Sequence, residues 1–79
     1  MTTADDIKSW IVAGMPEADV AILGDDGAHF EARIVAAAFE GQSTVARHRM
    51  VYAALGPRMG REIHALALKT LTPAEAGQA

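Results

Sequence analysis

Two short segments of alternating apolar side chains, separated by a turn, constrain this fold most. In the stretch ADVAILGDDGAHFEARIVAA, Val20 and Ile22 alternate with Ala21 and Leu23 before the turn. After it, Phe30, Ala32 and Ile34 alternate with Glu31 and Arg33, so every second side chain can face one apolar layer. Between them, Asp26-Gly27 is a dipeptide that suits the positive φ of a tight hairpin turn. The pattern predicts a β-hairpin with one buried face, and with Glu31 and Arg33 on the other face, towards water.

The segments on either side of the hairpin have helical spacing. Thr3 and Asp6 have the separation of a capping box, and apolar side chains then recur every three or four residues until Pro16. A second helix is expected between Ser43, a good N-cap, and Gly56. The arc predicted to face the core contains Val45, His48, Val51, Tyr52 and Leu55, with Arg47 and Arg49 flanking it and Met50 away from it.

The last third of the chain supplies one more strand. Residues 57–62, PRMGRE, can form a short helical turn, and residues 64–70, HALALKT, predict a strand with Leu66 and Leu68 inward. The predicted order is α-β-β-α-α-β, a two-layer α+β domain with helices on one face of a three-stranded sheet. A chain of 79 residues makes one domain with a thin core, 1–79, and we expect residues 1–4 and 74–79 to fray.

Composition excludes several classes of protein. The chain contains no cysteine, so it has no disulfide scaffold, no cysteine nucleophile and no self-contained iron–sulfur site. The first ten residues lack the pattern of a signal peptide, and no apolar stretch approaches the roughly 20 residues of a membrane span. We therefore expect a cytoplasmic protein with no membrane partner. Since no catalytic motif is present, we also expect no enzymatic activity.

Charge is distributed unevenly along the chain. Residues 1–40 carry eight acids and two bases, whereas residues 41–79 carry five bases and two acids. The segment 43–61 resembles a helix-turn-helix in its element order and is a candidate surface for phosphates or for an acidic partner, with ordinary solvated charges as the alternative. Its glycines, Gly56 and Gly60, have the wrong spacing for the Gly-x-x-Gly loop of a KH domain. The basic residues in question are Arg47, Arg49, Arg58, Arg61 and Lys69.

Four segments resemble the signature blocks of the BolA family, in the family's order: GDDGAHFEARIV, FEGQSTVARHRMVYAALG, EIHALALKT and TPAE. The resemblance runs from about residue 5 to residue 75, and this chain is more similar to the short bacterial type. It implies a fold like that of type II KH domains. It also implies two activities. Some BolA-like proteins form heterodimers with monothiol glutaredoxins and share a glutathione-bound 2Fe-2S cluster, and others are DNA-binding regulators of transcription.

The resemblance also implies roles for two of the three histidines. His64 corresponds to the histidine of the family's IHAL block, a cluster ligand in glutaredoxin complexes, and His29 lies in the loop that often carries the second ligand. If the family resemblance is set aside, His64 is interpreted as a structural histidine at a strand end. For His29, the alternative to a ligand is an exposed histidine in a turn. His48 is expected to pack on its helix with one ring nitrogen hydrogen-bonded.

The favoured hypothesis is therefore a non-catalytic adaptor in iron–sulfur handling that binds a monothiol glutaredoxin. His64 and His29 would supply nitrogen ligands, and thiolates would come from the partner and glutathione, because imidazole can replace cysteine on one iron of a 2Fe-2S centre. The isolated chain would hold no cofactor and would be a monomer or a weak homodimer. The alternative hypothesis is a DNA-binding regulator that uses the basic segment 43–61.

Overall fold

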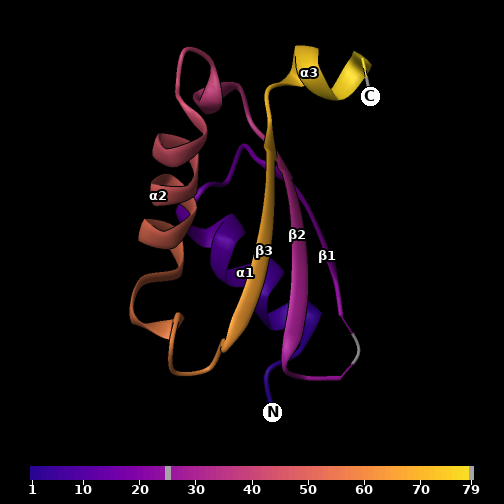
Figure 1. Ribbon diagram of the computed structural model, residues 1–79, viewed down its shortest axis with the longest axis vertical. Coiled ribbons are helices and arrows are strands. Elements are labelled where there is room, and N and C mark those ends of the chain that lie inside the picture. Colours follow the sequence, from indigo (N-terminus) through magenta and orange to yellow (C-terminus); the bar gives the residue numbers. More distant parts are fainter. Residues whose placement is uncertain (25, 79) are drawn as a thin grey trace.

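Two helices cover one face of a three-stranded sheet in this protein, for which we use a computed structural model (Figure 1). The structure describes residues 1–24 and 26–78. In chain order the elements are α1 (Ala4–Gly14), β1 (Asp19–Leu23), β2 (His29–Val35), the 3-10 turn η1 (Ala37–Phe39), α2 (Thr44–Leu55), the 3-10 turn η2 (Gly56–Arg58), β3 (Ala65–Leu71) and α3 (Pro73–Gln78). The predicted α+β architecture is confirmed.

The predicted hairpin forms the first half of the sheet. β1 pairs antiparallel with β2, and Val20 lies opposite Ile34. Along β2 the side chains alternate as predicted, since Phe30 and Ile34 are buried while Glu31 is exposed. β3 then pairs with β2 in parallel, after the crossover through α2, so β2 is the central strand.

A single core lies between the sheet and the helices. It takes side chains from every layer: Ile7, Ile11, Val20, Phe30, Ala32, Ile34, Ala36, Phe39, Val51, Leu55 and Ile63. Leu66 and Leu68 of β3 pack against it from the inward face of the strand, as predicted. The open face of the sheet has no helix over it in the part of the chain described (Figure 1).

Helix α1 begins and ends where the sequence predicts. Thr3 and Asp6 form the complete capping box, and the helix ends at Gly14, two residues before Pro16. Gly14 also lets α1 approach α2 closely, because a Cβ atom added there would lie 2.7 Å from the Cβ of Ala54. The two helices therefore meet at two small residues.

The buried face of α2 differs from the predicted arc. Ser43 caps the helix, and Val51 and Leu55 are fully buried as expected. Val45 and Tyr52, however, are 59 % and 41 % exposed, so this part of the prediction is wrong. Met50, predicted to lie away from the core, packs against it.

Two inward positions of α2 explain this rotation. Ala54 faces α1 at the close approach described above, and the long side chain of Arg47 lies against the sheet and donates to the carbonyl of Thr70. A pattern that counts only large apolar residues misses both, because alanine buries little surface and arginine can bury its stem while its charged end finds acceptors.

Both ends of the chain form hydrogen bonds with the rest of the domain or within their own turn. Thr72 and Glu75 form a capping box in which each side chain accepts from the other residue's backbone N–H, at 3.2 Å and 2.8 Å, and α3 follows. Thr2 likewise donates from its hydroxyl to the carbonyl of Glu62. The fraying of residues 1–4 and 74–79 stays a prediction. Asp25 of the predicted turn and Ala79 at the predicted frayed end lie outside the described residues.

Candidate functional site

His29 stands at the first position of β2, immediately after the hairpin turn, and Asp26 holds its ring. The Asp26 Oδ1 accepts the backbone N–H groups of Ala28 and His29 at 2.9 Å and 2.8 Å, and Oδ2 lies 2.9 Å from His29 Nδ1. The pKa of Asp26 is lowered below its usual range. The hydrogen bond from the His29 N–H has the largest effect, followed by those from the Ala28 N–H and the His29 ring. The turn thus ends in an ionised carboxylate that fixes the histidine beside it.

The contact with Asp26 determines which nitrogen of His29 is available. A carboxylate only accepts hydrogen bonds, so Nδ1 of a neutral ring must carry the hydrogen and Nε2 keeps its lone pair. The His29 side chain is 78 % exposed, so a molecule in solution can reach that lone pair. Metal-ligating histidines commonly have this arrangement, with a carboxylate on the nitrogen that does not bind the metal.

His64 lies in the bend just before β3 and is exposed. No described residue hydrogen-bonds its ring nitrogens, so the ring is neither sealed nor already occupied by those residues. The segment before it is well anchored, because Ile63 is fully buried, its N–H donates to the carbonyl of Arg58 at 3.0 Å and its carbonyl accepts from Gly60 at 2.8 Å. A fixed backbone therefore presents an accessible imidazole.

Sheet register brings the two histidines to the same end of neighbouring strands. His29 is the β2 partner of Ala65, the residue after His64, and both strands start at the end that holds the hairpin turn (Figure 1). His29 and Ala65 are direct partners on strands spaced by ~4.8 Å, and His64 precedes Ala65 by one residue, in the bend. Over the described ranges, no cluster of three or more His, Cys, Asp or Glu side chains could hold a metal ion.

The side chain of His64 does not follow strand alternation into the core. Strict alternation would direct residue 64 to the same side as Leu66, which packs inward. Instead the bend lets Ile63 occupy the inward position, and His64 remains exposed.

His48 belongs to a different part of the molecule. It lies half-buried on α2, as expected for a packed histidine. Within residues 1–24 and 26–78, however, its ring has no hydrogen-bond partner, which differs from the predicted one.

Arg47 differs from the exposed arginine that the sequence suggested. Its side chain is 13 % exposed, its Nε donates to the Gln42 carbonyl at 2.9 Å, and its Nη1 donates to Thr70 O at 3.2 Å and to Glu75 Oε1 at 2.7 Å. The hydrogen bond from Arg47, and then that from Thr72 N–H, lowers the pKa of Glu75. Arg47 therefore ties α2 to β3 and α3.

The other basic residues lie on separate parts of the surface. Arg58 lies 4.7 Å from the ring centre of Trp10 on α1, and Arg49 and Arg61 are exposed on α2 and the following loop. Lys69 is on the open face of the sheet, where it is the direct β3 neighbour of Arg33. The segment 43–61 contains one α-helix followed by the 3-10 turn η2, and no second α-helix.

The family model described as BolA-like protein matches residues 11–75. The chain belongs to the BolA-like family. Among solved structures, a bolA protein homologue from Coxiella burnetii is 51 % identical, with a TM-score of 0.89 over 98 % of this chain and 99 % of that one. The BolA domain of SufE1 from Arabidopsis thaliana is 31 % identical, with a TM-score of 0.75 over 91 % and 93 %. The resemblance found in the sequence is confirmed.

Two curated relatives of this BolA-like chain are longer proteins. SufE-like protein 1 of Arabidopsis thaliana is 49 % identical over 53 residues, which are 66 % of this chain and 14 % of the relative. Human BolA-like protein 1 is 47 % identical over 47 residues, which are 60 % of this chain and 34 % of the relative. The matched region thus spans only 14 % of the first relative's length and 34 % of the second's. No helix in the described part of the chain is long and apolar enough to cross a membrane.

Proposed function

We propose that this BolA-like chain is a non-catalytic adaptor in iron–sulfur handling, which binds a monothiol glutaredoxin and shares a glutathione-ligated 2Fe-2S cluster with it. The observation that carries the proposal is the placement of two exposed imidazoles, His29 and His64, at one end of adjacent strands. The BolA domain of a SufE-like relative supports the coarser statement, a role related to iron–sulfur chemistry.

The donor chemistry of the two residues fits half of a cluster site. Imidazole is a borderline ligand that suits iron, and two histidines replace two cysteines on one iron of Rieske centres. This chain has no cysteine, so the thiolates of the cluster would come from the glutaredoxin and from glutathione. His29 would bind through Nε2 with its ring oriented by Asp26, and His64 through either ring nitrogen.

The role of this chain is then to bind and orient. The backbone hydrogen bonds before His64 and the carboxylate beside His29 would restrict the ligand positions before the partner arrives, which would lower the entropy lost on binding. When bound, the cluster would supply electron transfer and sulfur chemistry. The adaptor's residues hold nitrogen lone pairs on an accessible edge.

The test is a titration of holo-glutaredoxin, loaded with glutathione and the 2Fe-2S cluster, with this chain. We expect the visible absorption and circular dichroism to change for the parent chain and to stay unchanged for His64→Ala, with an intermediate result for His29→Ala. His48→Ala is the matched control, because it removes an imidazole from α2 and should behave as the parent does. The proposal is wrong if the parent leaves the spectrum unchanged, or if His64→Ala gives the parent's spectrum.

The placement of the basic residues does not support the DNA-binding alternative, because they do not form one continuous surface. Arg47 uses its guanidinium within the domain, and Lys69 lies on the sheet face opposite to α2. Several arginines on one face would be needed to neutralise neighbouring phosphates. We therefore keep the adaptor as the single proposed function.

A further inference from the structure

The open face of the sheet is more apolar than a solvated sheet face needs to be. Antiparallel sheets that face water on one side usually alternate apolar and polar residues, with the polar ones outward. Here β3 presents mainly small or apolar side chains outward, and Leu23 of β1 is 67 % exposed. From one end of the sheet to the other, the cross-strand rows of this outer face are Asp19–Val35–Leu71, Ala21–Arg33–Lys69, Leu23–Glu31–Ala67 and His29–Ala65.

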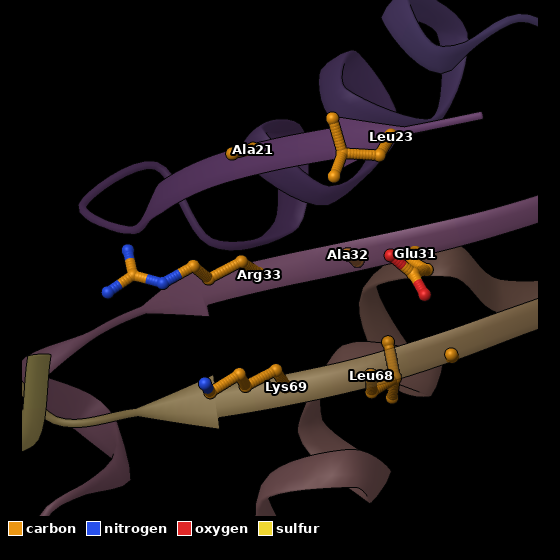
Figure 2. A pocket seen from close by; sticks show the side chains of 8 residues that line it. Ala21, Leu23, Glu31, Ala32, Arg33, Leu68 and Lys69 are labelled. Carbon is orange, nitrogen blue, oxygen red and sulfur yellow. The ribbon is translucent and has the colours of Figure 1, made fainter. Parts of the chain in front are cut away.

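The two middle rows form a shallow groove of about 370 Å³ (Figure 2). Alanines 21 and 67 leave space between larger side chains, and Arg33 and Lys69 extend side by side from neighbouring strands. Glu31 lies two residues from Arg33 on the same face. None of these three charges forms an ion pair with a described residue, so each has its hydrogen-bonding capacity open to a partner.

We propose that a second copy of this chain packs on the outer face of the sheet. The two copies are related by a two-fold axis that lies between the two sheets, perpendicular to the strands and at the level of Ala32. Such an axis reverses strand direction, so each residue 31 faces residue 33 of the other copy. The register then places Glu31 opposite Arg33 of the second copy and next to its Lys69. The ion pairs occur twice, once on each side of the axis.

Side-chain size is complementary under the same operation. Leu23 shares a row with Glu31, and Ala21 shares a row with Arg33, so Leu23 of one copy faces Ala21 of the other. In the same way Ala67 faces the stem of Lys69. Large side chains thus enter the spaces that small ones leave, as in sheets packed face to face at ~10 Å.

The charge pattern distinguishes this arrangement from the other two-fold. An axis parallel to the strands would place Glu31 on Glu31 and Arg33 on Arg33, which like-charge repulsion disfavours. An anionic partner fits less well, because Glu31 and Asp19 balance the two cations of the rows. The second copy is therefore the occupant that the face fits, and this inference does not depend on the proposed adaptor function.

Sedimentation equilibrium of the full chain, from about 10 µM to about 1 mM, tests the proposal. We expect the parent to self-associate and each single reversal, Glu31→Arg or Arg33→Glu, to weaken self-association by about tenfold or more, because each change affects two symmetric ion pairs. An equimolar mixture of the two variants should associate at least as tightly as the parent. The double variant E31R/R33E should associate more tightly than either single variant, since positions 31 and 33 of the two copies again carry opposite charges; it should stay weaker than the parent, because Lys69 of the second copy then lies beside a like charge at position 31.

Arg49→Glu is the matched control, because it reverses an exposed charge on α2 and should leave self-association unchanged. Circular dichroism verifies that each variant is folded. If a charge-reversal variant does not fold, Glu31→Gln or Arg33→Gln is used in its place. A parent that stays monomeric over the whole range overturns the proposal. So do single reversals that associate as the parent does, and a mixture of the two that does not associate.

Discussion

Replacing Arg47 by methionine separates its structural contacts from any surface role. Methionine keeps the apolar stem of the side chain and removes the guanidinium, which donates to the carbonyls of Gln42 and Thr70 at 2.9 Å and 3.2 Å. The guanidinium also lies 5.9 Å from the ring centre of Phe39. The change therefore tests the polar contacts that Arg47 makes to β3 and to Glu75 of α3, with little change in packed volume.

The expected loss follows from those two carbonyls. A hydrogen bond contributes about 1 kcal/mol net, and a part-buried acceptor left without a donor adds about 1 kcal/mol, so Arg47→Met should lower the free energy of unfolding by about 2–3 kcal/mol. For a domain of this size, the loss corresponds to a fall in Tm of about 10–20 °C. Denaturant unfolding followed by circular dichroism measures the free energy directly.

Arg49→Met provides the comparison, because Arg49 lies exposed on the same helix and has no hydrogen bond to a described residue. This variant should unfold within about 0.5 kcal/mol of the parent. If Arg47→Met proves equally harmless, the contacts of Arg47 with β3 and α3 contribute no stability and Arg47 becomes available for a surface role.

Two further predictions concern the carboxylates. Because the pKa of Glu75 is lowered, the stability that this carboxylate contributes is present above its ordinary pKa of 4.5 and is lost as pH falls through its folded-state pKa. The difference in unfolding free energy between the parent and Glu75→Gln should therefore shrink from about pH 6 to about pH 3. A difference that does not vary with pH would refute this. Asp26→Asn keeps an oxygen for the turn N–H groups but places an amide donor against His29 Nδ1. The neutral ring should then change to the tautomer with hydrogen on Nε2, which removes the lone pair from that nitrogen. Cluster binding should therefore weaken by about 10–100-fold. Nitrogen chemical shifts of the His29 ring report the tautomer, and an unchanged tautomer would contradict the assigned role of Asp26.

Features of the fold that depend on neighbouring residues were predictable from the sequence. The period-2 alternation of the hairpin and the caps at Thr3 and Ser43 are local, and all three are confirmed. The face of α2 was not predictable, because it depends on a carbonyl of β3, 23 residues away, which accepts from Arg47. The Thr72–Glu75 capping box is equally local, because the segment TPAE has the spacing of such a box.

The candidate site was predictable to a different extent. His64 and His29 were singled out through the family resemblance, and sheet register accounts for their shared end of the sheet. The role of Asp26 was missed, although an aspartate three residues before a histidine in a turn was a usable signal. The neighbouring positions of Arg33 and Lys69 could not be predicted, since they depend on the register between strands that are distant in the sequence.

The most direct test of the account is pulsed electron paramagnetic resonance on the reduced cluster in the mixed complex. This chain would be labelled with ¹⁵N, and the glutaredoxin and glutathione would be left unlabelled. The account predicts strong ¹⁵N hyperfine coupling of the kind that directly bound imidazole gives, and its loss in His64→Ala. A complex that forms and carries the cluster but shows no such coupling from the labelled chain would contradict the claim that these imidazoles bind iron.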